Sequence, residues 1–201
     1  MTQNNNVKIA ITGGIGSGKS TVSKIISESG FKVYSCDKIY SELLHEKNFL
    51  SKLENEFGDI LLNNGELDRK KLASIVFSDS EKLLKLNEIT HPEIIRRALD
   101  KMTDGGISFC EVPLLFENGF ERFFNNAIVV LRDKNLRINS VRKRDKLSEN
   151  AINLRIKSQY DYDYNVFTQY YVIHNNTNME DLYSDTLKII EKIKKDYLFL
   201  A

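Results

Sequence analysis

A glycine-rich run near the N-terminus constrains the fold of this chain more than any other feature. Residues 13–20 read Gly-Gly-Ile-Gly-Ser-Gly-Lys-Ser and match the pattern G-x-x-x-x-G-K-[ST] in full. The apolar, β-branched segment 7–12 predicts a strand before the run, and residues 19–29 predict a helix after it, which Gly30 ends. At ordinary glycine frequencies, a chance match in a chain of this length has a probability of about 1%. The strand–loop–helix context therefore predicts a phosphate-binding loop.

Each part of this loop has a physical role. Glycines allow backbone N–H groups to turn inward around phosphate oxygens, and the helix that begins at Lys19 directs its positive end to the same anion. We expect Lys19 to reach the β- and γ-phosphates of ATP, and Ser20 to hold Mg²⁺ through its hydroxyl. The predicted nucleotide-binding residues of the loop are Gly14, Gly16, Ser17, Gly18, Lys19, Ser20 and Thr21.

The rest of the chain alternates predicted strands with predicted helices. Apolar runs at 31–35, 107–112, 127–131 and 171–174 predict four more strands. A strongly basic helical segment is expected at 134–159, and an amphipathic closing helix at 179–197. The alternation predicts an α/β fold of the P-loop nucleotide-kinase type, with a five-stranded parallel sheet flanked by helices.

The segment between the second and third predicted strands is largely helical. Asp68 is expected to cap a helix that runs to about residue 77, and Asp79 or Ser80 to cap the next one. Pro92 suits the first turn of another helix that runs towards residue 102. A block of this length exceeds what a crossover between parallel strands needs, so it predicts an inserted substrate-binding domain.

The composition describes an ordinary globular protein. The formal net charge is +1, hydrophobic residues make up 41% and charged residues 28%, which indicates no general nucleic-acid or membrane surface. Residues 1–6 are polar, and no apolar run approaches the length of a membrane span. Cys36 and Cys110 lack the spacing of a zinc site and are expected to be reduced thiols. We therefore expect a cytoplasmic protein with no nucleic-acid or membrane partner, for which an oligomer is not required.

A phosphate-binding loop alone does not define the reaction. The chain has no Asn-Lys-x-Asp guanine motif, and its helical insertion suits an ATP-dependent kinase with a small-molecule acceptor. Asp37 follows the second strand at the edge where α/β proteins bind ligands, so it is either the catalytic base or the N-cap of the next helix. Glu111, at the end of the third strand, either contacts the metal or its water or, in the slightly favoured alternative, is a solvated charge.

Four arginines of the basic segment are candidates for a lid that closes on the transferring phosphoryl group. The alternative is an ordinary solvated helix face, which we expect for most of them but not for one or two. The four are Arg137, Arg142, Arg144 and Arg155.

Two aromatic or imidazole features also leave alternatives open. His91 either binds a phosphate or sugar of the substrate, or caps and packs a helix. The alternating Tyr160, Tyr162 and Tyr164 form either an aromatic binding strip or, as we expect, a surface loop.

Several short pieces of the sequence, taken together in their order and spacing, resemble one family. They are residues 12–21, Cys36-Asp37-Lys38-Ile39, His91-Pro92 with Ile94, Val112-Pro113-Leu114-Leu115-Phe116-Glu117, Arg144-Asp145, Gln159, and Val172-Ile173 with Asn175. The phosphate loop and the proline–leucine–leucine run are the most specific of these pieces. Together they resemble the dephospho-CoA kinase family over nearly the whole chain.

The resemblance implies transfer of the γ-phosphate of ATP to the 3′-hydroxyl of dephospho-CoA, the last step of coenzyme A synthesis, with Mg²⁺ as the cofactor. It implies that Asp37 is the base, Lys19 the phosphate clamp and Arg144 the lid cation, and that Asn175 lies beside the adenine. The residues that it implies for binding dephospho-CoA are Asp37, His91, Leu114, Leu115 and Glu117.

The resemblance also implies a division of the chain. Residues 1–37, 106–140 and 166–201 would form the nucleotide-binding core, 38–105 the helical CoA domain and 141–165 the lid, in one compact unit. The chain departs from the family's pattern where an acidic residue, a lid arginine, a lysine and an alanine-aspartate pair are usual. Ser35 stands where the acidic residue is usual, and Ser140 stands where the lid arginine is usual. The lysine is usual near Asn165, and the alanine-aspartate pair is usual where Gln169-Tyr170 stand.

The departures affect the lid and the adenine contacts, and Arg142 or Arg137 is expected to substitute for the arginine missing at position 140. Two rival functions therefore stay open. One is a kinase for another nucleotide or small metabolite, and the other is a nucleotide-binding regulatory protein without transfer activity.

Overall fold

The computed structural model describes residues 6–62, 64–103, 105–163 and 167–198. Contacts divide the chain into two units, one formed by residues 1–34 with 101–201 and the other by residues 35–100. The phosphate loop and the basic segment that follows the fourth strand both belong to the first unit.

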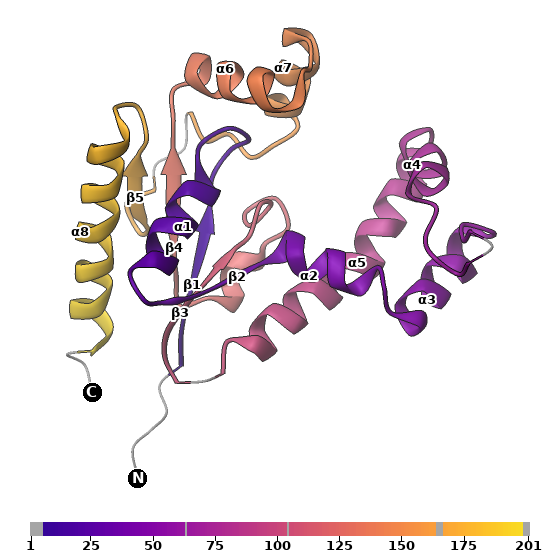
Figure 1. The fold of residues 1–201 in the computed structure, drawn as a ribbon, viewed down its shortest axis with the longest axis horizontal. Helices are drawn as coiled ribbons and strands as arrows, with labels where there is room; N and C mark the ends of the chain where they lie inside the picture. Colours follow the sequence, from indigo (N-terminus) through magenta and orange to yellow (C-terminus); the bar gives the residue numbers. More distant parts are fainter. Residues whose placement is uncertain (1–5, 63, 104, 164–166, 199–201) are drawn as a thin grey trace. The chain divides into compact units, whose positions relative to one another are not determined.

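A five-stranded parallel sheet is the centre of the first unit, which confirms the predicted fold class (Figure 1). Its order is β2-β3-β1-β4-β5, so β1 lies between β3 and β4. The register places Ile11 opposite Glu111 and Thr12 opposite Val129. The carboxyl ends of these three strands therefore meet at one edge, directly beneath the phosphate loop. The strands are β1 (Asn6–Thr12), β2 (Lys32–Ser35), β3 (Gly106–Glu111), β4 (Asn126–Leu131) and β5 (Tyr171–His174).

One face of the sheet is covered by α1 (Lys19–Glu28) and α8 (Met179–Leu198), which pack against each other. Side chains alternate between the two faces of a strand, so every second residue of the strands points to these helices. The resulting core joins strand residues such as Ile9, Ile11 and Ile128 to Ile26 of α1 and Ile193 of α8, all of which are fully buried. This packing fixes the start of α1 against the sheet.

The other face of β4 and β5 carries an aromatic cluster. Val129 packs there with Tyr162 and Phe167, and Phe116 stacks on Phe167 with ring centroids 5.6 Å apart. Tyr162 is only 5% exposed, so the expectation of a surface loop is wrong for this residue, because its ring fills the space above β4. Tyr164 lies outside the described residues.

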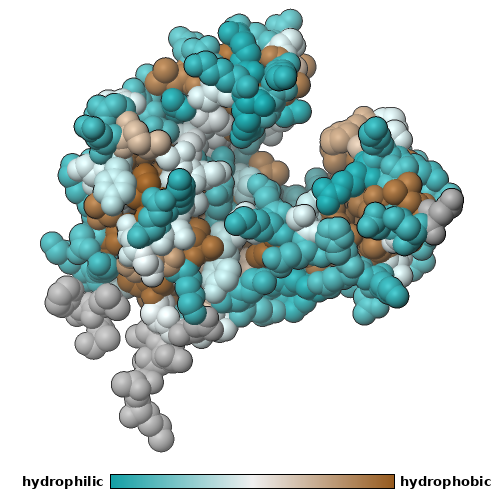
Figure 2. Space-filling model, in the orientation of Figure 1, coloured by the Kyte–Doolittle hydropathy of each residue, from teal (hydrophilic) through white to brown (hydrophobic). Residues whose placement is uncertain are grey.

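The basic segment forms two helices rather than one, α6 (Lys134–Asp145) and α7 (Glu149–Lys157). Lys146 ends α6 in the left-handed region at φ 55°, and the hydroxyl of Ser148 accepts from Ala151 N to cap α7. Ile138, Val141 and Ile152 form a small core between the two helices. Their outer surface is largely hydrophilic (Figure 2).

The second unit is helical, with α2 (Cys36–Leu43), α3 (Lys47–Phe57), α4 (Arg69–Phe77) and α5 (Ser80–Lys101). Asp68 caps α4 as predicted, since its side chain accepts from the backbone of Lys70 and Lys71. The prediction that a new helix begins at Pro92 is wrong, because α5 continues through this proline. Proline in a helix interior removes one backbone hydrogen bond, a loss that a helix of this length can absorb locally.

No helix in the described part of the chain combines the length and apolarity needed to cross a membrane. Cys36 and Cys110 are both buried and are not joined in a disulfide, as expected.

Candidate active site

Five carbonyl groups of the phosphate loop accept hydrogen bonds from side chains. Two are bound by the lysine of the loop itself and three by side chains that approach from later parts of the chain. The bonds are Lys19 Nζ to Gly13 O (2.8 Å) and Gly14 O (3.2 Å), Arg137 Nε to Ile15 O (3.1 Å), Arg132 Nη1 to Gly16 O (3.4 Å) and Asn175 Nδ2 to Ser17 O (2.8 Å).

This pattern determines which groups face a ligand. In a trans peptide the N–H points away from the carbonyl. Arg137, Arg132 and Asn175 hold the carbonyls of Ile15, Gly16 and Ser17 from later parts of the chain, which directs the N–H groups that follow these carbonyls inward. Inward N–H groups at the start of a helix form a favourable site for a phosphate. The loop therefore has the geometry of an anion-binding cradle before any ligand arrives.

Glycine is needed in this loop for two separate reasons. Gly16 and Gly18 have φ angles of 76° and 99°, in the region that favours glycine. A Cβ on Gly16 would also lie 2.7 Å from the carbonyl oxygen of Arg137, and one on Gly18 would lie 2.3 Å from Nδ2 of Asn175. Backbone conformation and close packing by α6 and the segment after β5 both exclude a larger residue.

Ser20 and Glu111 form the best candidate for a metal-binding pair. Ser20 Oγ donates to Glu111 Oε1 and Ser23 Oγ donates to Oε2, both at 2.9 Å. Both carboxylate oxygens of Glu111 therefore have serine partners in α1, and its contact with a metal or its water stays a prediction. A hydroxyl beside a carboxylate is an oxygen donor set that suits Mg²⁺ with water and phosphate ligands. Among the described residues no group of three His, Cys, Asp or Glu is placed to hold a metal by itself.

Asp37 lies in the first turn of α2, with its side chain exposed. The reading of Asp37 as the helix N-cap is wrong, since Ser35 is the cap and its hydroxyl accepts from Lys38 N at 3.4 Å. Asp37 belongs to the second unit and the phosphate loop to the first. Its role as the base stays a prediction.

The four arginines of the basic segment have different surroundings. Arg137 is buried, with Nη1 3.3 Å from Asp163 Oδ1, and its pKa is lowered because burial disfavours the charged form. It therefore does not belong to a solvated face. Arg144 is exposed and donates to Asp145 through two nitrogens. Hydrogen bonding to this carboxylate raises the pKa of Arg144. Arg155 approaches the same Asp145, at 3.7 Å.

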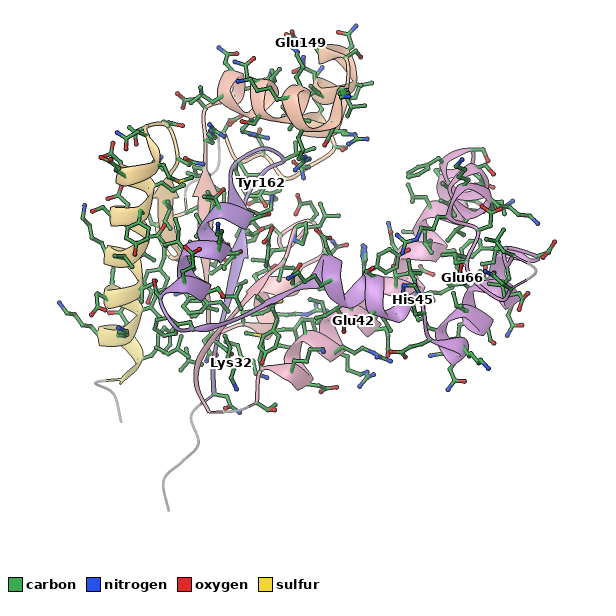
Figure 3. All side chains as sticks on the ribbon, viewed as in Figure 1. Lys32, Glu42, His45, Glu66, Glu149 and Tyr162 are labelled. Atoms are coloured by element: carbon green, nitrogen blue, oxygen red, sulfur yellow. The ribbon has the colours of Figure 1, made fainter. Side chains whose placement is uncertain are left out.

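Arg142, the fourth arginine, forms an ion pair with Glu149 at the start of α7. Figure 3 labels this glutamate at the outer end of the helix pair. The surroundings of Arg142 and Arg155 fit the solvated helix face expected for most of these residues.

A cavity of about 460 Å³ lies beside the loop in the first unit. Gly14 and Ser17 line it together with the end of β4, the start of α6 and Tyr162, whose position beside the loop is marked in Figure 3. Ser17 Oγ and Arg132 Nε are buried and have no hydrogen-bond partner among the described residues. The volume is in the range of small-molecule pockets, and the two polar atoms give it hydrogen-bonding capacity for a ligand or water.

The remaining predicted site residues are divided between the two units. Leu114 is 36% exposed, whereas Leu115 is completely buried and belongs to the core of the first unit. Glu117 Oε1 accepts from the backbone N of Tyr160 at 2.8 Å, which ties the segment after β3 to the segment after α7. His91 lies inside α5 in the second unit. Their roles in binding substrate stay predictions.

Asn175 is buried and links the phosphate loop to the end of β4. Its side chain donates to Ser17 O, and its backbone N donates to Leu131 O. The expectation that it lies beside the adenine stays a prediction. The position near Asn165 where the family usually has lysine lies outside the described residues.

Arg132 and the loop contact of Gln159 were missed by reasoning from the sequence. Arg132 Nη1 donates to Ser140 Oγ at 2.9 Å, so this guanidinium lies beside the position where the lid arginine is usual. The signal that could have found Arg132 is its place directly after β4, since polar residues at the carboxyl ends of parallel strands often line a site. No sequence signal predicts which loop atom Gln159 contacts.

Comparison with known proteins identifies the family. The model of the dephospho-CoA kinase family matches residues 7–181 of this chain. The chain belongs to the dephospho-CoA kinase family. A dephospho-CoA kinase from Fusobacterium nucleatum subsp. nucleatum is 42% identical over 189 residues, covering 92% of this chain and 97% of the relative. The resemblance drawn from the sequence is therefore confirmed, and the chain is an ATP-dependent phosphotransferase.

Solved structures agree with membership of the dephospho-CoA kinase family. A structure titled dephospho-CoA kinase from Campylobacter jejuni has a TM-score of 0.70 and 31% identity, covering 94% of this chain and 98% of that one. A shikimate kinase from Bacteroides thetaiotaomicron has a TM-score of 0.55 at 12% identity, with 94% of this chain and 98% of that chain covered. This last likeness shows the shared fold alone.

Proposed function

We propose that this protein transfers the γ-phosphate of ATP to the 3′-hydroxyl of dephospho-CoA and so produces coenzyme A. The observation that carries the proposal is the family match over residues 7–181, which includes a phosphate loop with no departure from its pattern. The organisation of the loop supports it, since Arg137 holds the carbonyl of Ile15 and so directs the N–H of Gly16 towards the place a triphosphate would occupy.

The phosphate loop would bind and orient the nucleotide. Lys19 Nζ now donates to two loop carbonyls and would exchange them for the β- and γ-phosphate oxygens. Ser20 and Glu111 would hold Mg²⁺, directly or through its water, and the ion would neutralise charge on the phosphates. Because Ser23 holds the second carboxylate oxygen of Glu111, the carboxylate is oriented before the metal binds.

Two further residues would act on the transferring group. Asp37 would accept the proton of the 3′-hydroxyl, which an exposed carboxylate at the start of α2 can do once the acceptor is in reach. Arg144, on the exposed side of α6, would stabilise charge on the moving phosphoryl group after releasing Asp145. The remaining proposed contacts to dephospho-CoA come from His91, Leu114, Leu115 and Glu117.

The cellular setting is part of the same proposal. A cytoplasmic enzyme that requires no oligomer and no nucleic-acid partner is supported by the near-neutral net charge of +1 and by two buried cysteines that form no disulfide. Residues 38–105 would bind dephospho-CoA and 141–165 would form the lid.

The decisive experiment measures ADP release with Mg²⁺ and ATP, with and without dephospho-CoA, and identifies the product by mass. We expect ADP release that requires dephospho-CoA and a product one phosphate heavier. Asp37→Asn should lower kcat about 10²- to 10⁴-fold while ATP binding is kept, as expected for loss of a general base. Folded protein that binds ATP but phosphorylates another alcohol, or none, would exclude the proposed acceptor.

A further inference from the structure

The tip of the phosphate loop is held from the lid side at one residue, Ile15. Gln159 Oε1 accepts from Ile15 N at 2.7 Å, and Arg137 Nε donates to Ile15 O at 3.1 Å. Gln159 follows α7 and Arg137 lies in α6, so the two ends of the helix pair each bind one polar group of the same residue.

The side chain of Ile15 strengthens this attachment. It packs against the small core that Ile138, Val141 and Ile152 form between α6 and α7. Both glycines beside Ile15 lie against α6, since a Cβ on Gly14 would be 2.5 Å from Arg137 Nη2. The loop tip is therefore part of the packing of the helix pair.

Arg137 is itself locked in place. Its side chain is only 3% exposed and its Nη1 pairs with Asp163 Oδ1, which lies in the segment after Gln159. A buried guanidinium with few alternative partners has little freedom to leave the Ile15 carbonyl.

The two bonds have opposite effects on the ligand side of the loop. The bond from Arg137 turns the Ile15 carbonyl outward, so the N–H of Gly16 in the same peptide faces inward. The bond to Gln159 takes the N–H of Ile15 out of the cradle. The orientation of both peptides around Ile15 therefore depends on residues of the helix pair.

We propose that Gln159 and Arg137 are positioning residues that fix the loop at Ile15, so that nucleotide binding and the order of α6 and α7 are coupled through this residue. The inference rests on the proposed nucleotide site but not on the identity of the acceptor. Coupling of this kind is reciprocal: ADP bound at the loop should order the helix pair by the same free energy with which the ordered pair favours ADP.

The test compares Gln159→Leu with Gln159→Glu, in the full chain, by calorimetric titration with Mg²⁺-ADP. Leucine removes the acceptor for Ile15 N, and we expect the Kd to rise about tenfold, which corresponds to about 1.4 kcal/mol. Glutamate keeps an acceptor oxygen, so its Kd should stay within about threefold of that of the unaltered protein. The matched control is Asn150→Leu, the same kind of change at an exposed position of α7, which should leave the Kd unchanged.

Hydrogen exchange distinguishes this coupling from a merely structural role, because a structural role would not make the protection of α7 depend on ADP. In the unaltered protein, ADP should slow the exchange of amides in α7, and Gln159→Leu should abolish this protection while Asn150→Leu keeps it. Arg137→Met should abolish it as well, with KM rising for ATP but not for the acceptor. Equal Kd values for the leucine and glutamate variants, or full protection in Gln159→Leu, would overturn the proposal. Absence of any ADP binding by the unaltered protein would instead refute the nucleotide site itself.

Discussion

Replacement of Gly18 by alanine tests how tightly the phosphate loop is packed. Gly18 has a φ of 99°, and a Cβ there would lie 2.3 Å from Asn175 Nδ2. Asn175 would have to move, and its hydrogen bond to the carbonyl of Ser17 would be lost. The substitution therefore combines a strained backbone with an unpaired buried carbonyl.

The two effects have separate magnitudes. The left-handed conformation costs an alanine about 1–2 kcal/mol, and a buried carbonyl without its partner costs about 1–3 kcal/mol. We expect Gly18→Ala to lower the free energy of unfolding by about 2–5 kcal/mol, and Asn175→Ala by about 1–3 kcal/mol. In the double variant the hydrogen bond is lost only once, so the total should fall short of the sum by about 1–3 kcal/mol.

The assay is urea unfolding of the nucleotide-free protein, followed by circular dichroism. Gly30→Ala is the control, since Gly30 has a similar φ of 91° but no atom within 4 Å of the place that a Cβ would take. It should cost only the backbone contribution of about 1–2 kcal/mol and be additive with Asn175→Ala. Additivity of the Gly18 and Asn175 substitutions within about 0.5 kcal/mol would refute the reasoning.

Two further predictions concern carboxylates. Glu111→Gln should raise the Mg²⁺ concentration for half-maximal activity about tenfold or more, because the charged carboxylate next to Ser20, a proposed metal ligand, becomes a neutral amide. An unchanged Mg²⁺ titration at fixed ATP would contradict this. Hydrogen bonds from Arg96 and Arg97 lower the pKa of Glu93 from 4.5 to about 2, so its stabilisation is present above pH 4.5 and is lost as the pH falls from 4.5 towards 2. Glu93→Gln should therefore cost about 1–2 kcal/mol at pH 7, after solvent screening, and almost nothing at pH 2. Urea midpoints at the two pH values measure the difference, and an equal loss at both would contradict the assignment.

The elements that could be predicted are those whose signals are local. The loop pattern, the β-branched strands and the cap at Asp68 each depend on residues that are neighbours in sequence. For the same reason the five strands were found within a residue or two of their bounds. Local signals failed at Pro92, because a long helix stabilised along its length can tolerate one missing hydrogen bond.

The details of the site could not be predicted because they depend on distant partners. The partners of Ile15 lie 122 and 144 residues away, and those of Ser20 and Ser23 lie 91 and 88 residues away. Tyr162 was misread because its burial comes from β4 and Phe116 rather than from its own segment. The order of the strands in the sheet determines which distant residues come into contact, and no short stretch of sequence contains that order.

The bond between Asn175 and the Ser17 carbonyl has a consequence for synthesis of the protein. The two residues are 158 positions apart, and β4, which pairs with β1, also comes from the later half of the chain. A nascent chain emerges from the ribosome N-terminus first, so the glycine loop leaves long before its supports. During that interval the chain carries the complete loop sequence without the three later side chains that hold the carbonyls of Ile15, Gly16 and Ser17. The nucleotide site is therefore a late product of translation, and a chain released early should lack affinity for ATP.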